Sequence, residues 1–392
     1  MLRFVAIDGL RAWMAWLVLA MHIVQQGLPG GGPAAWIKLD LGGQAVDTFI
    51  IISGFVITHL LIERSGGYLA YIIPRFMRLF PAFVVACALG AGSLALGSQW
   101  AAAGWFEPSH GIEYRNLIAY LPAHSVAHLL MLHGAIPNTV LPLSEYAFIP
   151  PGWSVSLEWQ FYLVAPAVIW LCRTHSRAVV LVGTVAIMSV AYHFALRPLW
   201  DRPSFLVGTA KFFLIGIGCR FAAPYLAGRL PYVAATGLSL ACSLLWIGPP
   251  SIAMWMLVYA FVLRKPDVAI GMDLVHVRVM RALLESRATL FLAERSYSTY
   301  LLHWPIITLM GAIATHRGVS AGPALTLWML PAVPLVLVIQ EVVYRVVERP
   351  GRQLGKRWAL RLGAPDPIEI AAETAVTGNP HERNAGGIPV AT

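Results

Sequence analysis

The stretch Ile7–His22, IDGLRAWMAWLVLAMH, decides the fold, because it is apolar over most of its length and yet carries three ionisable side chains. At 100° per residue, Arg11 and His22 lie about 20° apart around a helix axis, and Asp8 lies within about 60° of both. The rise from Arg11 to His22 is roughly 16 Å, about half of a hydrocarbon core of ~30 Å. Ionisable groups at such depth are costly and mark function, so Asp8, Arg11 and His22 are candidate catalytic residues.

Two other interpretations of this stretch are a purely structural polar contact between helices and a signal peptide with a charged start. Asp8 and Arg11 interrupt the basic region that a signal peptide needs, and no cleavage motif of small residues follows. A membrane-spanning helix with a functional face is therefore the preferred interpretation.

The composition predicts a multi-pass membrane protein. Of 392 residues, 58% are hydrophobic and only 12% are charged, whereas a soluble domain has about 25% charged residues. The formal charge of +9 is concentrated in alternate loops, which is the pattern of cytoplasmic loops and not of a nucleic-acid-binding surface. Four cysteines without CxxC spacing lie in or beside apolar runs, so disulfide and metal roles are not expected: Cys87, Cys172, Cys219 and Cys242.

We expect an all-α bundle of about ten spans with both ends in the cytoplasm. Residues 1–352 would form the transmembrane domain, and residues 353–392 a cytoplasmic tail that is largely disordered. The apolar segment 117–133 would lie at the membrane interface. The expected spans are 10–28, 44–62, 74–97, 153–172, 178–196, 206–223, 231–248, 251–263, 296–314 and 323–347.

Polar residues recur at helical spacing inside the span 153–172. Ser154, Glu158 and Tyr162 are spaced i, i+4 and i+8, so they share one face. Glu158 would lie roughly 8 Å below the outer surface, at a depth similar to that of His22. We therefore expect the carboxylate and the imidazole to meet, either in an active site or as a buried pair that fixes helix packing.

Two further polar groups are predicted at other spans. Ser296 and His303 lie within about 20° of each other around the ninth span, with Tyr300 nearby, and form either a second wall of the same cavity or hydrogen bonds between helices. Arg75 and Arg78 stand one turn apart at the cytoplasmic start of the third span. Two guanidiniums beside free backbone N–H groups suit phosphate, although they could instead contact lipid headgroups.

The remaining clusters are assigned structural roles. His124 and His128 have a possible metal spacing and His133 follows, but no HExxH motif is present and no metal is expected. Three charged residues at the end of the last span lie one turn apart and are expected to pair there or with the basic inner loop: Glu341, Arg345 and Glu348.

Four sequence blocks follow one another in a fixed order. The first block is Asp8–Arg11 with His22, and the second is Asp47–Phe49 with Ser53–Phe55, followed by Pro74-Arg75-x-x-Arg78-Leu79-x-Pro81. The third block is Trp153-Ser154-x-x-x-Glu158-x-Gln160-Phe161-Tyr162. The fourth block is Ser296–Pro305, and the segment Val347–Pro350 closes the series. Together they resemble the membrane-bound acyltransferase-3 family, integral-membrane O-acyltransferases that modify bacterial polysaccharides, peptidoglycan and some antibiotics. The resemblance covers about residues 3–352.

The resemblance implies an acyl-CoA donor, acetyl-CoA by default, with no permanently bound cofactor. The acceptor would be a hydroxyl of a glycan or glycoside, and the protein would reside in the bacterial inner membrane. The family's histidine falls on His22, its Arg-x-x-Arg pair on Arg75 and Arg78, and its tryptophan–glutamate block on Trp153 and Glu158. Many relatives carry an extra C-terminal hydrolase-like domain. Here only a short tail follows, so any acyl relay would occur within the bundle.

The mechanism expected from these residues places the donor phosphates at Arg75 and Arg78 and the thioester near His22. His22 would act as a general base, because imidazole exchanges protons near neutral pH, or as a covalent acyl carrier. Asp8 and Arg11 would orient the first helix or pair at the inner mouth. Five residues are candidates for substrate binding, two of them (Ser154 and Tyr300) for stabilising an oxyanion: Trp153, Ser154, Tyr162, Tyr300 and His303.

Other function classes remain open at this point. Acylation of a small glycosylated natural product is an alternative acceptor within the same chemistry. A transporter or flippase also carries intramembrane ionisable residues, but it would predict inverted repeats, which the two halves of this sequence do not show. A scaffold protein would not need the histidine deep in the first helix or the arginine pair.

Overall fold

A computed structural model describes residues 4–28, 40–63, 66–102, 118–227, 250–264, 275–320 and 322–363, which form helices and no strand. The all-α prediction is confirmed. The expected span 231–248, which includes Cys242, and the tail beyond residue 363 lie outside the described residues. The helices are α1 (Val5–Gly27), α3 (Leu41–Glu63), α4 (Tyr68–Ala102), α6 (Leu121–Leu129), α7 (Trp153–Cys172), α8 (His175–Ala191), α9 (Leu206–Leu226), α11 (Pro250–Leu263), α12 (Val275–Glu285), α13 (Arg287–His316), α14 (Pro323–Met329), α15 (Ala332–Val343) and α16 (Arg349–Arg361).

Seven segments of the described chain are long and apolar enough to cross a membrane, which makes the protein a multi-pass membrane protein. This is fewer than the predicted ten. The central helix α13 falls outside the seven because polar residues such as Ser296, Tyr300 and His303 interrupt its apolar sequence. The seven segments are Val5–Gly27, Leu41–Glu63, Tyr68–Ser93, Pro150–Cys172, His175–Leu199, Leu206–Leu226 and Pro323–Arg361.

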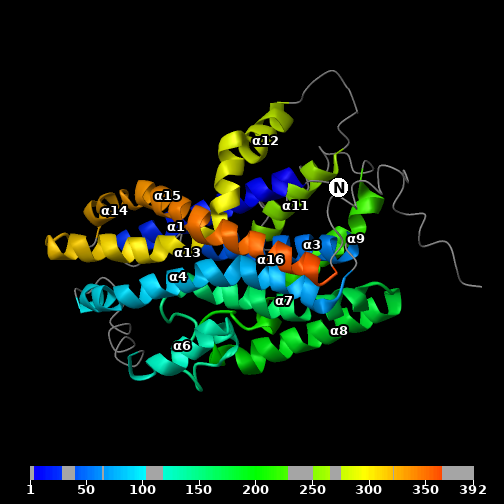
Figure 1. Ribbon diagram of the computed structural model, residues 1–392, viewed down its shortest axis with the longest axis horizontal. Helices are drawn as coiled ribbons and strands as arrows, with labels where there is room; N and C mark the ends of the chain where they lie inside the picture. The colour runs from blue at the N-terminus through cyan, green and yellow to red at the C-terminus, as the bar shows by residue number, and fades with distance from the viewer. Residues whose placement is uncertain are drawn as a thin grey trace, which may run out of the picture.

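The bundle is organised around α1 and α13, which pack along each other (Figure 1). Helix α3 joins α1 to α9, and α4 lies between α13 and α16. We call the end where α1 and α4 begin the near end, and the opposite end, which carries residues 118–152, the far end. Helix α12 stands away from the bundle in Figure 1 and is held at its C-terminal end, where Trp13 Nε1 donates to the Leu283 carbonyl over 2.8 Å.

The last described helix runs beyond the predicted domain boundary. Helix α16 continues to Arg361, and Gly351 and Gly355 place its backbone against α4. A Cβ at Gly355 would lie 2.8 Å from Cβ of Met77, so only a glycine allows this approach. The predicted pairing is confirmed for Glu341, which binds both Arg345 and Arg295. Glu348 instead lies 3.6 Å from Arg352 of α16, a partner that was not predicted.

Helices α3 and α9 cross with their backbones in contact. A Cβ at Gly216 would lie 2.1 Å from the carbonyl oxygen of Ile51, and a Cβ at Gly54 would lie 2.4 Å from that of Phe213. Small residues at both positions are therefore required for the crossing, as is common where membrane helices approach closely.

We predict that Gly216→Ala destabilises the bundle by about 1–3 kcal/mol, because the added methyl group overlaps backbone that cannot move independently. The measurement is the midpoint of thermal unfolding in detergent. Gly218→Ala is the matched control on the same helix, since a Cβ there meets nothing within 4 Å. Equal midpoints for the two variants would contradict a tight α3–α9 crossing.

Three buried histidines hold the far-end segment against the bundle. The rings of His128 and His133 stack with centroids 3.9 Å apart, and His133 stacks on Phe83 at 5.6 Å. His128 Nδ1 donates to the His124 carbonyl over 2.8 Å, and His133 Nε2 donates to the Gly152 carbonyl over 3.1 Å. Desolvation lowers the pKa of His133 to about 3 and that of His128 well below its usual value, so both rings are neutral.

A buried carboxyl group, Glu145, joins the same segment to the start of α9. Its Oε1 accepts from Ser204 Oγ over 2.9 Å, and its Oε2 accepts from the backbone N–H of Arg202 over 2.7 Å. Burial raises the pKa of Glu145 to about 7. Ser204 Oγ also lies 2.8 Å from the Gly134 carbonyl oxygen, and its single hydrogen is shared between these two acceptors, so two loops of the far end belong to one hydrogen-bond network.

The histidine cluster predicts a loss of stability in acid. An unfolded histidine takes up a proton below pH ~6.5 while folded His133 stays neutral down to pH about 3, so stability falls as the pH drops through this window. The change is up to about 1.4 kcal/mol per pH unit for each proton taken up. Glu145 has the opposite effect, because its pKa is raised from 4.5 to about 7 on folding. Between these two values the folded state binds the proton more tightly, so the contribution of Glu145 to stability increases as the pH falls.

The variant His128→Phe with His133→Phe keeps the stacked rings and removes both titrating groups. We expect its unfolding midpoint to fall less than that of the parent protein between pH 6.5 and 4, since Glu145 contributes equally to both. His193→Phe, at an exposed position, is the control and should follow the parent. Parallel acid curves for the double variant and the parent would exclude the cluster as the cause.

Candidate active site

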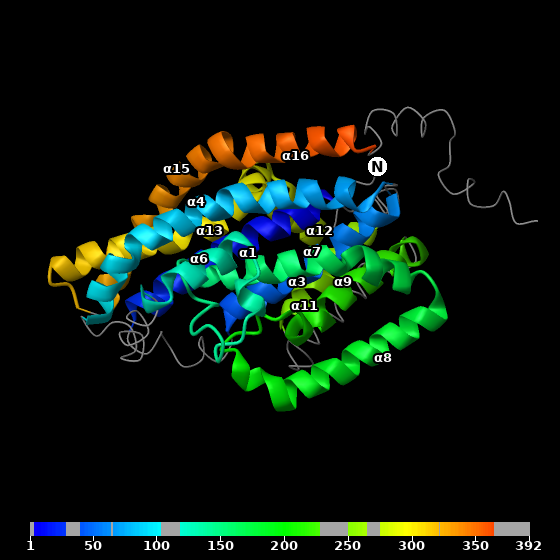
Figure 2. The same cartoon turned by 60° about the horizontal axis from the view of Figure 1, so that its bottom comes forward.

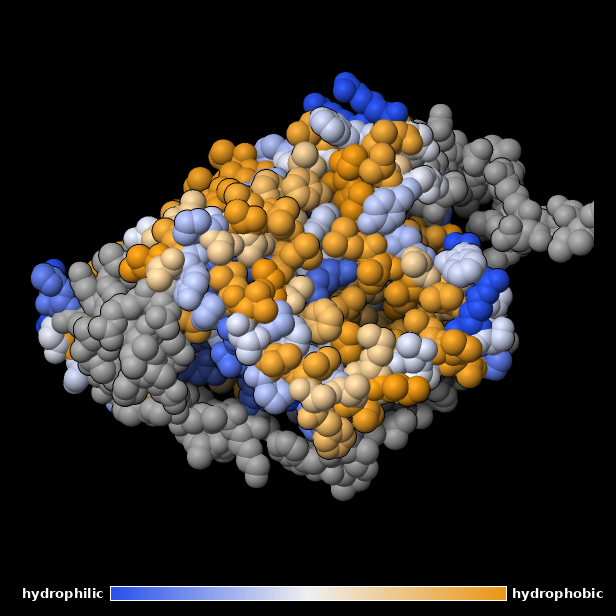
Figure 3. All heavy atoms as spheres, turned by 90° about the horizontal axis from the view of Figure 1, so that it is seen from below, coloured by the Kyte–Doolittle hydropathy of each residue, from blue (hydrophilic) through white to orange (hydrophobic). Residues whose placement is uncertain are grey.

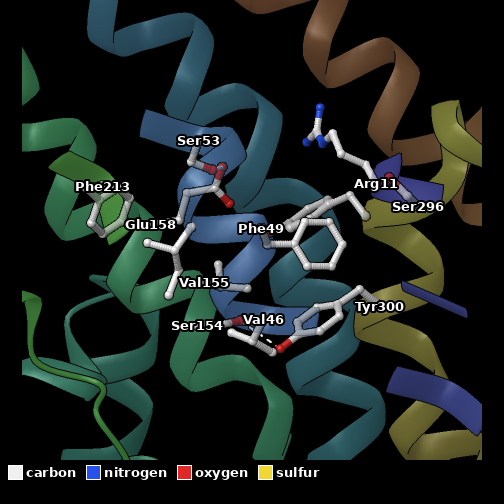
Figure 4. Close-up of a pocket in the computed structure, with 12 residues that line it drawn as sticks. Arg11, Val46, Phe49, Ser53, Ser154, Val155, Glu158, Phe213, Ser296 and Tyr300 are labelled. Atoms are coloured by element: carbon white, nitrogen blue, oxygen red, sulfur yellow. Dashed lines mark hydrogen bonds between the residues drawn. The ribbon is translucent and has the colours of Figure 1, made fainter. Parts of the chain in front are cut away.

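A small polar cavity lies where α1, α3, α7, α9 and α13 meet (Figure 4). It encloses about 50 Å³, which is room for a few water molecules. Polar and apolar side chains share its surface, and each polar group in a membrane bundle needs a partner. Its lining residues are Arg11, Val46, Phe49, Ile50, Ser53, Ser154, Val155, Glu158, Phe213, Ser296, Tyr297 and Tyr300.

Glu158 lies at one end of the cavity, facing Ser53 (Figure 4). Its Oε1 accepts a hydrogen bond from Ser53 Oγ over 3.3 Å and another from the hydroxyl of Tyr162, one turn further along α7. Beyond Tyr162, Arg78 lies within electrostatic reach of both Glu158 and Glu348. A carboxylate in a membrane helix thus has two hydroxyl donors and a nearby cation, which offset part of its desolvation cost.

Ser154 and Tyr300 meet at the other end of the cavity, and the ring of Phe49 stands between the two ends (Figure 4). The two hydroxyl oxygens are 2.8 Å apart, and the Tyr300 hydroxyl lies 3.0 Å from the carbonyl oxygen of Pro151. Phe49 meets Tyr300 edge to face, with centroids 5.9 Å apart. Ser296, one turn before Tyr300, lines the same cavity, so α13 supplies one polar wall and α7 another.

His22 and His303 form a hydrogen-bonded pair one turn beyond Tyr300. His22 Nδ1 is 2.8 Å from His303 Nε2, the rings are nearly parallel, and Trp304 packs edge-on against His22. His303 is fully buried, whereas His22 is half-buried. His303 Nδ1 lies 3.3 Å from the carbonyl oxygen of Thr299. Neither histidine lines the cavity.

This pair fixes the protonation of both neutral rings. A carbonyl oxygen only accepts, so His303 Nδ1 carries the proton that faces Thr299, and His303 Nε2 must then accept. His22 Nδ1 therefore donates to His303, and the lone pair of His22 lies on its Nε2. The arrangement leaves one defined basic nitrogen on α1.

The predicted contact between Glu158 and an imidazole is wrong. In the described part of the chain, the hydrogen-bond partners of Glu158 are Ser53 and Tyr162, and that of His22 is His303. The reason is helix packing: α1 packs along α13, while α7 packs against α3 and α9. The two side chains also lie at different heights, because Ser154 meets Tyr300. Glu158 is one turn from Ser154 towards the near end, and the His22–His303 pair is one turn from Tyr300 towards the far end.

Arg11 has hydrogen-bonding capacity to spare at the cavity. Its guanidinium lies 4.0 Å from the carboxylate of Asp8, one turn earlier on α1, and its Nε is buried without a hydrogen-bond partner. Arg11 also lines the cavity, and its guanidinium points away from Phe49 and Tyr300 in Figure 4.

The remaining predicted residues are not among those that line the cavity. Trp153 is partly buried in the core at the start of α7. Arg75 Nη1 donates to the Tyr71 carbonyl over 3.3 Å, one turn earlier on α4. Arg75 and Arg78 thus lie towards the near end of the bundle, whereas the histidine pair lies towards the far end.

Two partners in the site were not assigned by sequence analysis. Ser53 belongs to a quoted block but received no role, because a single serine in an apolar run is usually satisfied by its own helix. Thr299 supplies only its backbone carbonyl, which no side-chain pattern indicates. The i, i+4 spacing of Thr299 and His303 was the available signal.

The helical bundle encloses a cavity lined by a carboxylate, hydroxyls and a guanidinium, and an oriented imidazole lies beyond it. These features define an integral-membrane protein with a candidate active site inside the membrane. The acyltransferase-3 profile, described as an acyltransferase domain, matches residues 4–340. The chain therefore belongs to this family of membrane acyltransferases, and the resemblance predicted from its sequence blocks is confirmed.

Three curated relatives illustrate its similarity to known proteins. The putative membrane-bound transacylase BcsY of Komagataeibacter xylinus is 26% identical over 369 residues, covering 88% of this chain and 82% of that protein. The O-acetyltransferase OatA of Staphylococcus aureus is 24% identical over 390 residues, covering 89% of this chain but only 57% of that protein. The acyltransferase MdmB of Streptomyces mycarofaciens is 26% identical over 403 residues, covering 93% and 96%. No solved structure matches the chain.

Proposed function

We propose that this protein is an acyl-CoA-dependent O-acyltransferase of the bacterial inner membrane. It would transfer an acyl group, acetyl by default, from cytoplasmic acyl-CoA to a sugar hydroxyl of an exported or cell-surface glycan. The family membership and the relative named as an O-acetyltransferase support the chemistry. The observation that carries the proposal is the His22–His303 pair, which presents a defined basic nitrogen inside the bundle.

In this proposal His22 Nε2 is the general base. It removes the proton of the acceptor hydroxyl, whose oxygen attacks the thioester carbonyl. When the tetrahedral intermediate collapses, the carbon–sulfur bond breaks and the CoA thiolate takes the proton back from Nε2. His303 accepts from His22 Nδ1 and stabilises the imidazolium in between, a positioning role similar to that of a carboxylate in a catalytic triad.

The donor would bind from the near end, taken as cytoplasmic. Arg75 and Arg78 would hold its phosphates, since guanidinium groups bind phosphate through two parallel hydrogen bonds. The pantetheine arm would pass the cavity, where Arg11 offers an unpartnered Nε to a carbonyl oxygen. Asp8, 4.0 Å from Arg11, would orient that guanidinium.

The acceptor sugar would be held by the polar groups of α7 and α13. Glu158, fixed by Ser53 and Tyr162, can accept from sugar hydroxyls, and Ser154 with Tyr300 can turn a hydroxyl towards a developing oxyanion. Trp153 would contribute an apolar ring at the start of α7. The cavity of about 50 Å³ is too small for a sugar, so binding requires the surrounding side chains to move apart.

Removal of the base should abolish transfer without unfolding the protein. We expect His22→Ala to lower kcat by about 10²- to 10⁴-fold, the usual contribution of a general base. The measurement is transfer of label from acetyl-CoA to glycan in membranes, with the thermal midpoint as a folding check. His316→Ala, at an exposed position on α13, is the control. Normal turnover by His22→Ala would refute the mechanism.

A second experiment distinguishes general-base catalysis by His22 from a covalent acyl-histidine intermediate. Labelled acetyl-CoA is supplied without acceptor, and the protein is then rapidly denatured near neutral pH and tested for bound label that acid releases, because an N-acyl imidazole hydrolyses readily in acid. Label on the parent protein that His22→Ala lacks would establish an acyl-histidine carrier, and its absence supports the general base.

Loss of the paired guanidiniums should weaken donor binding selectively. We expect Arg75→Gln with Arg78→Gln to raise the KM for acyl-CoA about tenfold or more, because charge-assisted hydrogen bonds contribute about 1.5–3 kcal/mol each. The KM for the acceptor should rise less, because Arg78 acts on the acceptor site only through its electrostatic effect on Glu158. Arg177→Gln, near the same end but on α8, is the matched control. An unchanged donor KM in the double variant would place the phosphate site elsewhere.

A further inference from the structure

Helix α12 presents an apolar surface that the bundle does not use. One side of the helix packs against the core, and it consists of Val277, Met280 and Leu284. A second side spans about 80° around the axis at 100° per residue and is 44–68% exposed. We call this side the apolar sector, and it consists of Val275, Val279 and Leu283.

A third side of α12 is basic. Arg278 and Arg281 are exposed and lie about 60° apart around the axis, between the apolar sector and the core-facing side. We call these two residues the basic sector. Arg287, at the start of α13, is also exposed, and the one acidic residue between 275 and 287 is Glu285, 3.8 Å from Arg281. This part of the chain therefore combines a net positive charge with an exposed apolar surface.

The C-terminal end of α12 is fixed to α1 and α13. A Cβ at Gly9 would lie 1.9 Å from the Leu284 carbonyl oxygen, so α12 meets α1 in backbone contact there. The Leu283 carbonyl oxygen accepts from Trp13 Nε1 over 2.8 Å and from Thr289 Oγ1 over 2.9 Å. From this junction α12 runs across the long axis of the bundle, along which α1 and α13 lie (Figure 1). The fold thus sets the direction in which each sector faces.

The junction lies at the level where α1 enters its apolar run. The side chain of Asp8 is 55% exposed, and the expected span begins two residues later, at Leu10. Trp13, one turn further along α1, is 46% exposed, and tryptophan is enriched where a helix passes the membrane–water boundary. An amphipathic helix that crosses the bundle axis at this level lies along the membrane surface.

The surface of α8 provides a contrast. Helix α8 stands away from the rest of the bundle in Figure 2, and only 6% of the most apolar part of the segment His175–Leu199 is buried. Hydrophobic residues predominate on this side of the molecule, seen from below in Figure 3. Such a surface suits lipid tails and does not select among headgroups, whereas arginines beside apolar side chains suit the boundary that contains the phosphates.

We propose that α12 is an interfacial helix that binds anionic phospholipids at the near end of the bundle. The basic sector pairs with the lipid phosphates through charge-assisted hydrogen bonds, and the apolar sector lies among the outermost methylene groups of the acyl chains. Charge complementarity selects this occupant, because a neutral lipid satisfies the apolar sector but carries no net charge for the arginines. The inference does not depend on the proposed acyl transfer.

The test measures which lipids contact the apolar sector. The photoreactive amino acid p-benzoylphenylalanine is placed at Val279 of the full chain, in nanodiscs of equal amounts of phosphatidylglycerol and phosphatidylcholine, with one of the two lipids radioactive at a time. We expect phosphatidylglycerol to be captured about fivefold more than phosphatidylcholine, which is the effect of roughly one arginine near a charged surface.

Two pairs of substitutions test the role of charge. Arg278→Gln with Arg281→Gln should bring the capture ratio at Val279 close to one. Arg173→Gln with Arg177→Gln is the matched control, because it removes two exposed cations at the same end, beside α8, and it should keep the parent ratio.

A second position reports on bulk lipid. The same photoreactive amino acid at Ile187 of α8, which is 72% exposed, should capture both lipids equally, also in the Arg278 and Arg281 double variant. His22→Ala should keep the parent ratio at Val279, so loss of acyl transfer with that ratio intact concerns the proposed function alone. Equal capture of both lipids at Val279, capture of a protein there instead of lipid, or a ratio that the double variant leaves unchanged overturns the proposal.

Discussion

The structure depends on one constraint: a polar side chain inside an apolar bundle must find a partner, because lipid offers none. Some of these partners lie on the same helix, as Tyr162 does for Glu158, and others come from other helices. The hydrogen bonds that satisfy these groups therefore also fix which helices lie side by side and at what height. The cross-helix pairs are His22 with His303, Ser53 with Glu158, and Ser154 with Tyr300. The bonds that hold these helices together thus run through the candidate site.

The same constraint explains how much of the fold could be predicted from the sequence. Long apolar runs such as 44–62 identified membrane helices, because hydrophobicity alone decides them. The predicted helix ends were less accurate where a helix continues beyond its apolar residues into charged ones. Helix α13 begins at Arg287, before the expected start at 296, and α16 continues to Arg361 as a basic amphipathic helix. Charged residues end an apolar run without ending a helix.

For the candidate site, the spacing of residues along the chain predicted which side chains share a helix face, but not which helices pack against each other. The face shared by Ser154, Glu158 and Tyr162 is present, since it follows from helical geometry alone. The partner of His22 was assigned wrongly, because depth in the membrane does not specify which helices adjoin. That choice is made by long-range packing, including the close approach of α3 and α9 at Gly54 and Gly216. Backbone partners such as the Thr299 carbonyl leave no trace in side-chain patterns.

The helical segment Pro323–Arg361 has a consequence of its own. It consists of α14, α15 and α16, with a turn at residues 330–331 and a π-helical segment at Tyr344–Glu348, and it bends along its length (Figure 1). Its basic end is clamped to α4, so a change in lipid tail length must be absorbed by tilting that clamped pair together. Because α4 carries Arg75 and Arg78, membrane thickness becomes a physical variable that acts on the arginine pair from outside the protein.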